Sequence, residues 1–178
     1  MTIASANLVI RRAKAGDAAS LAALQKDIYA EGRWFVGDGP PSASALTRRL
    51  RTLEPTASLY LVALSPNKNK EEVGAWLELH RLLPGKLRHV AMLTLAVAEP
   101  YRRRGVAQAL LEEAYRWGRQ VGLAKISLNV RANNRGALKL YEKEGFILEG
   151  RERAQVRLAD GFEDNLIMAK FLTELENR

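Results

Sequence analysis

A short basic loop between an apolar segment and an amphipathic one constrains this chain more than any other feature. Residues 90–97 are almost all apolar, which predicts a largely buried strand. After the loop, apolar residues recur at helical spacing, at Val106, Leu110, Ala114 and Trp117. This spacing predicts a helix that buries one face. The chain is therefore expected to run from a strand through the loop directly into the start of a helix.

The loop contains the run Arg102-Arg103-Arg104-Gly105-Val106-Ala107. The first amides of a helix lack intrahelical partners, and the helix dipole favours an anion there. Gly105 lets the backbone approach a ligand closely, the small Ala107 keeps the entrance open, and the arginines add positive charge. The run therefore predicts a phosphate-binding loop. The alternative is a solvated charge run in an ordinary strand-to-helix turn.

A second helix is predicted further along the chain from a cap at its start and a glycine at its end. Asn133 or Asn134 can cap the N-terminus, and Gly145 suits the left-handed residue that follows a helix. Between them, Ala137 and Tyr141 share one helix face. The predicted order is strand, phosphate loop, helix, strand, capped helix, strand.

With these two segments in place, the sequence resembles the GNAT superfamily of N-acetyltransferases. The family's loop pattern, Q/R-x-x-G-x-G/A, is met by residues 102–107. Its second pattern, roughly N-x-x-A-x-x-L-Y-x-x-x-G-F, is met by Asn134, Ala137, Leu140, Tyr141, Gly145 and Phe146. Two departures are that Arg103 stands where the family often has glycine and that Pro100 sits one position later than usual. Neither departure blocks an amide-lined loop.

The resemblance covers residues 8–172 and implies one α/β domain over residues 1–178. Its fold would be a mixed, mostly antiparallel central sheet flanked by helices, with splayed central strands. The resemblance also implies a site for acetyl-CoA in the cleft between those strands.

Each part of the implied cofactor site maps onto residues of this sequence. Backbone groups of Leu95, Ala96 and Val97 would bind the pantetheine arm and polarise the acetyl carbonyl. Loop amides would hold the pyrophosphate, at Arg102, Arg103, Arg104, Gly105, Val106 and Ala107. Asn134 would either contact the pantetheine arm or cap the second helix, and Ala137 belongs to the same cofactor-binding set.

Tyr141 matches the family's general acid, which protonates the departing CoA thiolate. A phenol has an ordinary pKa of about 10, so it can donate a proton at neutral pH. The alternative is that the ring only packs between helix and sheet. For the general base, Glu78 is the first candidate and His89 the second, with His80 also near the same turn. A surface salt bridge is the alternative for Glu78, and a turn position for either histidine.

The acceptor amine is expected near the first two helices, a region that includes Asp27, Glu31, Arg33, Trp34 and Phe35. Glu31 beside Trp34 and Phe35 would suit a cationic amine, whereas the two aromatic rings could equally form a lid or core. We expect a small amine, an amino acid or a peptide amine.

Two rival functions stay open. One is an acyl-CoA-binding module without turnover, and the other is an acetyltransferase of a macromolecule, either a ribosomal protein N-terminus or charged tRNA.

The amino-acid composition limits which metals, partners and cellular locations are expected for this protein. The chain has no cysteine, which excludes disulfides and thiolate metal sites, and the two histidines are not in metal-ligand spacing, so no metal is expected. The net charge of +8 favours anionic partners, either the phosphates of a cofactor or, alternatively, RNA or the ribosome. The sequence shows neither a signal-peptide core before Arg12 nor a bilayer-spanning run, so a cytoplasmic protein is expected. The resemblance makes a homodimer a further expectation.

The remaining elements follow from periodicity and turn residues. In the first part of the chain they are a strand over 7–12, a helix from an Asp17 cap to Tyr29 with Leu21, Leu24 and Ile28 on one face, a loop over 31–44 and a helix over 45–53. Strands over 59–64 and 73–79 follow, joined by a polar turn over 66–70, and Pro84-Gly85 breaks the chain after them. The last elements are a strand over 126–130 and a hairpin of 147–157 and 165–172 that turns at Asp160-Gly161.

Overall fold

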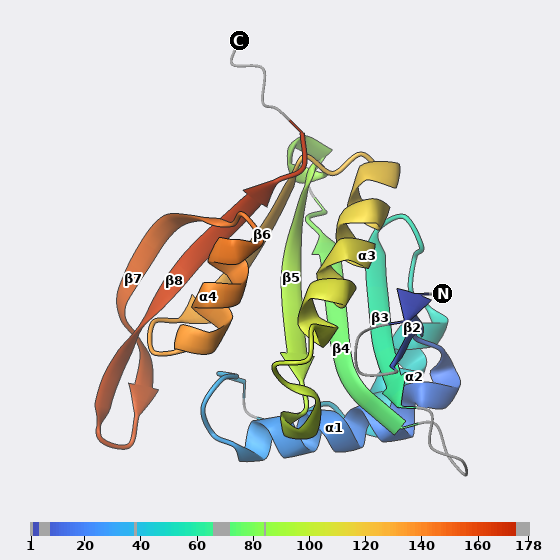
Figure 1. Ribbon diagram of the computed structural model, residues 1–178, viewed down its shortest axis with the longest axis horizontal. Helices are drawn as coiled ribbons and strands as arrows, with labels where there is room; N and C mark the ends of the chain where they lie inside the picture. The colour runs from blue at the N-terminus through green and yellow to red at the C-terminus, as the bar shows by residue number, and fades with distance from the viewer. Residues whose placement is uncertain (1, 4–7, 38, 66–71, 84, 174–178) are drawn as a thin grey trace. The chain divides into compact units, whose positions relative to one another are not determined.

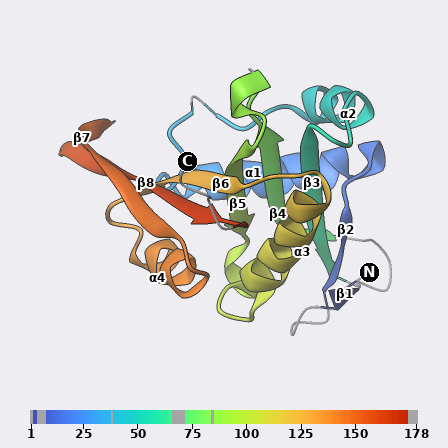
Figure 2. The same cartoon turned by 90° about the horizontal axis from the view of Figure 1, so that it is seen from above.

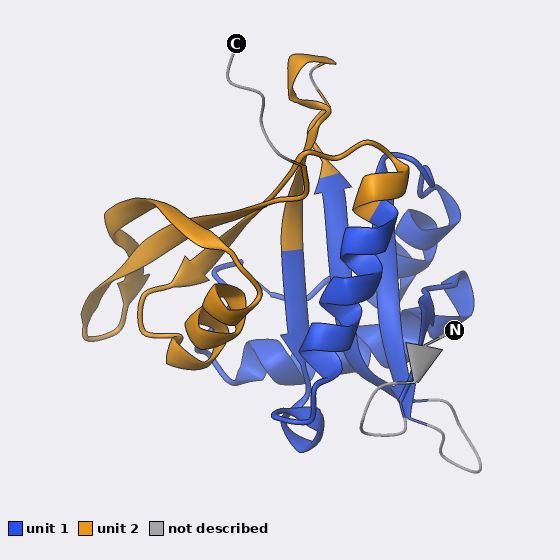
Figure 3. Cartoon of the chain, turned by 45° about the horizontal axis from the view of Figure 1, so that its top comes forward, with its two compact units in different colours: residues 1–80, 94–117 blue, residues 81–93, 118–178 orange. Residues whose placement is uncertain are grey.

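The computed structural model describes residues 2–3, 8–37, 39–65, 72–83 and 85–173. Along the chain the strands and helices are β1 (Thr2–Ile3), β2 (Val9–Arg12), α1 (Ala18–Ala30), α2 (Ala43–Arg51), β3 (Ser58–Ser65), β4 (Glu72–Arg81), β5 (Val90–Val97), α3 (Val106–Gln120), β6 (Lys125–Arg131), α4 (Arg135–Lys143), β7 (Ile147–Leu158) and β8 (Gly161–Phe171). Short 3-10 turns are η1 (Ala15–Asp17), η2 (Gly85–Leu87) and η3 (Glu99–Tyr101). Contacts divide the chain into two compact units, residues 1–80 with 94–117 (unit 1) and residues 81–93 with 118–178 (unit 2) (Figure 3).

Unit 1 is a sheet between two layers of helix. Strands β1, β2, β3 and β4 are successive antiparallel neighbours, and β5 lies beyond β4. Helices α1 and α2 cover one face of these strands, and α3 covers the other (Figures 1 and 2). Because both faces are covered, β3 is buried along nearly its whole length. This double burial explains why residues 59–64 form a continuous apolar run instead of alternating.

The apolar face predicted for α1 is confirmed. Leu21, Leu24 and Ile28 are all buried, in one cluster with Val62 of β3 and Trp76 of β4. Burying an aliphatic side chain of this size stabilises the fold by about 1.5–3 kcal/mol relative to leaving it exposed. The spacing of these residues therefore fixes which side of α1 faces the sheet.

Gly74 of β4 allows a close contact that positions the chain just before the predicted phosphate loop. A Cβ atom at this position would lie 2.6 Å from Cδ2 of the Tyr101 ring. The Ala98 N–H also donates to the Gly74 carbonyl at 2.9 Å. Because glycine leaves room for the ring, η3 lies directly on β4, and the loop that follows starts from a fixed point.

Unit 2 combines the first residues of β5 with β6, β8 and β7, in that order. β5 pairs in parallel with β6 only over residues 90–92 and 125–127, whereas β6 with β8 and β8 with β7 are antiparallel. Helix α4 lies against this sheet (Figure 1). The mixed, mostly antiparallel pairing confirms the predicted fold class, and so short a parallel ladder agrees with the predicted splay.

The N-terminal strand differs from the prediction. A strand was expected over residues 7–12, but β2 begins at Val9 and pairs with an additional strand, β1. Asp17 stands before α1 as predicted but makes no side-chain bond to that helix. Its carboxylate instead accepts the Lys14 N–H at 2.6 Å and pairs with Arg11 at 2.7 Å. Burial alone would raise the pKa of Asp17, but these bonds outweigh it and hold the pKa below its ordinary value.

Helix α2 begins and ends earlier than the predicted range of 45–53. Ser42 caps its N-terminus, because the Ser42 hydroxyl accepts the Ala45 N–H at 3.2 Å. The helix therefore starts at Ala43 and ends at Arg51. The strands predicted over 59–64, 73–79 and 126–130 and the C-terminal hairpin are confirmed, each with slightly wider or shifted ends. The polar turn over 66–70 and Pro84 lie outside the described residues.

Candidate active site

The predicted phosphate loop lies in unit 1, between η3 and α3. Two of its residues have a left-handed backbone, Arg103 with φ 61° and Gly105 with φ 76°. Helix α3 begins at Val106, and the Ala109 N–H donates to the Gly105 carbonyl at 3.0 Å. The amides at residues 106–108 therefore lie at a helix N-terminus, where the dipole favours an anion. Left-handed residues in such a loop also turn backbone N–H groups toward a common concave side.

The conformation of Arg103 gives a physical meaning to its departure from the family pattern. A left-handed backbone costs a non-glycine residue roughly 1–2 kcal/mol. Glycine avoids this cost, which explains why the family often has glycine there. Arg103 and Arg104 are exposed, so their charges face solvent from the loop.

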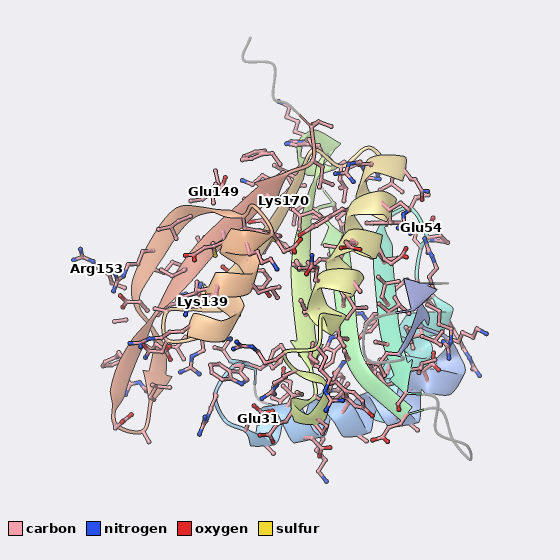
Figure 4. All side chains as sticks on the ribbon, viewed as in Figure 1. Glu31, Glu54, Lys139, Glu149, Arg153 and Lys170 are labelled. Atoms are coloured by element: carbon pink, nitrogen blue, oxygen red, sulfur yellow. The ribbon has the colours of Figure 1, made fainter. Side chains whose placement is uncertain are left out.

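Arg102 has a different role from the two arginines that follow it. Its Nε donates to the Val97 carbonyl at 2.8 Å, and its guanidinium forms an ion pair with Glu31. Val97 is the last residue of β5, and Glu31 follows the last residue of α1 (Figure 4). Arg102 therefore fastens the loop to both elements. Leu95 and Ala96, like Val97, are half-buried at the end of β5.

The three residues predicted to meet the acceptor all make contacts within unit 1. The Glu31 carboxylate binds Arg102 through one oxygen and accepts the Trp34 indole N–H at 2.9 Å through the other. The Phe35 ring stacks between Tyr29 and Trp76, with centroid distances of 5.1 and 5.8 Å. Phe35 thus packs against the core, and Glu31 links the segment after α1 to the phosphate loop.

The start of α4, in unit 2, shows the capping role for Asn134. The Asn134 side-chain oxygen accepts the Ala137 N–H at 3.1 Å. The helix ends at Lys143, and Gly145 just after it has φ 82°, as predicted. Of the two roles considered for Asn134, the structure therefore shows the cap.

Tyr141 lies on α4 with only 7% of its surface exposed. Its ring packs at a tilt against Phe146, with centroids 5.4 Å apart. Burial raises the pKa of the Tyr141 hydroxyl well above its ordinary value, because the phenolate would lose its hydration. The Tyr141 hydroxyl is therefore neutral throughout the physiological pH range.

Glu78 of β4 lies opposite Tyr60 of β3 in the sheet register. Its side chain is 13% exposed and forms an ion pair with Arg49 of α2. Burial raises the pKa of the Glu78 carboxyl, although the charges of Arg49 and His80 partly oppose that effect. Glu78 is therefore a partly buried carboxylate that holds a proton more readily than an ordinary glutamate.

The two histidines are both exposed. His80 Nδ1 lies 3.0 Å from the Ser58 hydroxyl. His89, in unit 2, precedes β5, and its carbonyl accepts the amides of Ala124 and Lys125 at 2.9 and 3.1 Å. His89 thus occupies the turn position considered as its alternative role.

The site residues divide between the two units. Residues 95–97 and 102–107, with Glu31 and Glu78, belong to unit 1, and Asn134, Ala137, Tyr141 and His89 belong to unit 2. The described residues contain no group of three or more His, Asp or Glu side chains that could hold a metal ion. Within the same part of the chain, no helix is long and apolar enough to cross a membrane.

Sequence reasoning missed Arg49 and Glu163, each of which forms an ion pair described in this structure. Arg49 pairs with Glu78, which is 29 residues away, and Glu163 pairs with Arg131, which is 32 residues away. No local spacing marks such pairs, because they form only when strand register and helix packing bring distant side chains together.

The fold and the loop together define an α/β protein in which a left-handed loop leads into the N-terminus of a helix. The chain belongs to the acetyltransferase (GNAT) family, whose family model matches residues 26–146.

Individual relatives agree with this assignment. The chain is 37% identical over 83 residues to the [ribosomal protein bS18]-alanine N-acetyltransferase of Escherichia coli, a match that covers 47% of this chain and 56% of that enzyme. The chain spans about half the length of the curated relatives it matches first.

Solved structures share the fold along nearly the whole chain. A GNAT-family acetyltransferase from Streptococcus pneumoniae superposes with a TM-score of 0.82 at 25% identity, covering 92% of this chain and 98% of that one. The yncA protein of Salmonella typhimurium, solved with its cofactor acetyl-CoA, has a TM-score of 0.84 at 14% identity, covering 97% and 98%.

Proposed function

We propose that this chain is an acetyl-CoA-dependent N-acetyltransferase that acts by direct attack of a primary amine. The observation that carries the proposal is the loop with left-handed Arg103 and Gly105, which leads into the N-terminus of α3 in a chain of this family. The loop suits a pyrophosphate because it offers backbone amides, two exposed arginines and the small side chain of Ala107. No metal takes part in the proposed reaction.

In the proposed reaction acetyl-CoA supplies the acetyl thioester, and this chain's residues bind it and move protons. Amides of residues 102–107 hold the pyrophosphate, and backbone groups of residues 95–97 bind the pantetheine arm together with Ala137 and with Asn134, whose side-chain oxygen also caps α4. The amine nitrogen bonds to the acetyl carbon, and the carbon–sulfur bond breaks. The nitrogen's proton passes to the general base, and the Tyr141 hydroxyl gives its proton to the sulfur.

Glu78 is the base we propose first, and His89 is the second candidate. The raised pKa of Glu78 favours this role, because a carboxylate of higher pKa accepts a proton more readily. The positive charge of Arg49 partly opposes this rise in the pKa of Glu78 and so favours the ionised carboxylate.

The proposed acceptor is the amine of a small molecule, an amino acid or a peptide. The Escherichia coli relative, named for acetylating the alanine of a ribosomal protein, supports a second candidate, the N-terminus of a macromolecule. The net charge of +8 would aid docking on RNA-bound targets. Binding to ribosomes that weakens steeply with salt would favour the second candidate, because phosphate contacts release counterions.

Thermal unfolding with and without acetyl-CoA tests the cofactor site. At about a hundred times its dissociation constant, a ligand that binds only the native state adds about 2.7 kcal/mol of stability. For a chain of this length that amounts to a rise in Tm of roughly 5–11 °C. Free adenosine is the control and is expected to give no comparable rise. If saturating acetyl-CoA leaves Tm unchanged, the loop is only a charged turn.

Replacing Glu78 by Gln tests the general base. We expect Glu78→Gln to lower kcat/KM by roughly 100-fold, because the amine loses its proton acceptor. Burial raises the pKa of Glu78, so the carboxylate forms only above the ordinary glutamate range near about 4.3, and the rate should rise with pH through that higher value. pH–rate profiles of Glu78→Gln, His80→Gln and His89→Gln are compared. If only His89→Gln loses the acidic limb, Glu78 is not the base.

A further inference from the structure

A buried ion pair in unit 2 has no part in the chemistry proposed above. It joins Arg131, the last residue of β6, to Glu163 near the start of β8, and their side chains are only 8% and 6% exposed. Arg131 Nε donates to one Glu163 oxygen at 2.6 Å. Burying two charges is costly unless their geometry and further hydrogen bonds compensate. The second carboxylate oxygen of Glu163 makes one of these further hydrogen bonds.

That second oxygen accepts the backbone N–H of Asn133 at 2.9 Å. Asn133 belongs to the three-residue loop that connects β6 to α4. The amides on either side are also held, since the Ala132 N–H donates to the Asp164 carbonyl at 3.0 Å and the Asn134 N–H donates to the Arg131 carbonyl at 2.9 Å. Neighbouring residues of β8 therefore bind two successive amides of this loop.

The loop fixes the start of α4. Asn134, the last residue of the loop, caps the helix through the Ala137 N–H. Tyr141 follows on the same nine-residue helix, about 9 Å along its axis from Arg135 at 1.5 Å per residue. A short helix behaves as a rigid rod over this length, so a shift at its first turn also displaces Tyr141.

We propose that Glu163 is a positioning residue that sets α4, and with it Asn134, Ala137 and Tyr141, through its bond to the Asn133 amide. The inference rests on the proposed function for the roles of those three residues. Glu163 binds the β6–α4 loop through its carboxylate and Asp164 through its backbone carbonyl, whereas the Asp164 carboxylate pairs with Arg151.

Two double variants isolate the bond to Asn133 without leaving a buried charge unpaired. Arg131→Met with Glu163→Gln removes both charges and keeps an oxygen that can accept the Asn133 N–H. Arg131→Met with Glu163→Leu removes the charges and that acceptor together. Replacing both partners by uncharged residues of similar shape is tolerated better than removing one. The control changes Lys125 to Met and Glu149 (Figure 4) to Leu, because this partly exposed ion pair joins β6 to β7 without bonding to the β6–α4 loop.

Amide hydrogen exchange and kinetics are measured on the full chain at a temperature where circular dichroism shows every variant folded. In the Leu variant we expect exchange at Asn133 and Ala137 to accelerate about tenfold or more and kcat to fall by a similar factor, because small displacements of catalytic groups are costly. The Gln variant and the Lys125–Glu149 control should stay within roughly threefold of wild type in both measurements.

The outcomes separate this inference from the proposed function. If the Leu and Gln variants exchange alike at Asn133, the bond does not hold the loop and the inference fails. If exchange differs but kcat is equal, Glu163 is structural only, and the positioning role is overturned. If the wild-type chain neither binds acetyl-CoA nor acetylates an amine, the proposed function fails. The hydrogen-exchange measurement needs no ligand, so it still tests whether the bond from Glu163 holds the Asn133 amide.

Discussion

Replacing Tyr141 by Phe is expected to lower kcat by about 100- to 1,000-fold while leaving the affinity for acetyl-CoA nearly unchanged, because only proton donation to the departing thiolate is lost. The ring and its contact with Phe146 survive the substitution. Tyr115→Phe is the matched control, since it removes the hydroxyl of another buried tyrosine on the body of α3. Steady-state rates and acetyl-CoA titrations measure both effects. Normal turnover by Tyr141→Phe would remove Tyr141 from the mechanism.

Replacing Tyr141 by Phe is also expected to change how the free energy of unfolding depends on pH at alkaline values. Because burial raises the folded-state pKa of Tyr141, its contribution to stability is complete below the unfolded value of about 10 and is lost as pH rises through the folded value. Phe has no proton to lose. Urea unfolding at alkaline pH should therefore show a smaller loss of stability for Tyr141→Phe than for wild type.

Replacing Gly105 by Val should weaken CoA binding by about 100-fold or more, because a β-branched residue cannot hold the left-handed backbone that aims the loop amides at the phosphates. The strain should also lower the free energy of unfolding by about 1–3 kcal/mol. Calorimetric titration with CoA and urea unfolding measure the two effects.

Gly122→Val is the control for backbone strain alone. Gly122 follows α3 with φ 73°, nearly the value of Gly105, and beyond its two chain neighbours no heavy atom lies within 4 Å of a Cβ placed there. Gly122→Val should lose a similar amount of stability and bind CoA like wild type. If Gly105→Val also binds CoA normally, the loop does not form the phosphate site.

Structural features that depend on a few neighbouring residues could be predicted from the sequence. The apolar run of β5, the spacing along α3, the cap at Asn134 and the glycine at Gly145 all act within one or two turns of chain. Periodicity and capping are local effects, so the order of elements and the phosphate loop could be derived without a structure. The two-residue strand β1 was missed because so short a segment has no period.

The tertiary structure alone decided which partner each functional side chain has. Glu31 is predicted to lie near the acceptor amine, and the structure adds that its carboxylate binds Arg102, 71 residues away. Phe35 could have been a lid or core, and stacking between Tyr29 and Trp76 places it against the core. The sequence by itself determined the loop and the cap of α4, because their hydrogen bonds join near neighbours. It left the ion pairs open, because those depend on how strands register and helices pack across the fold.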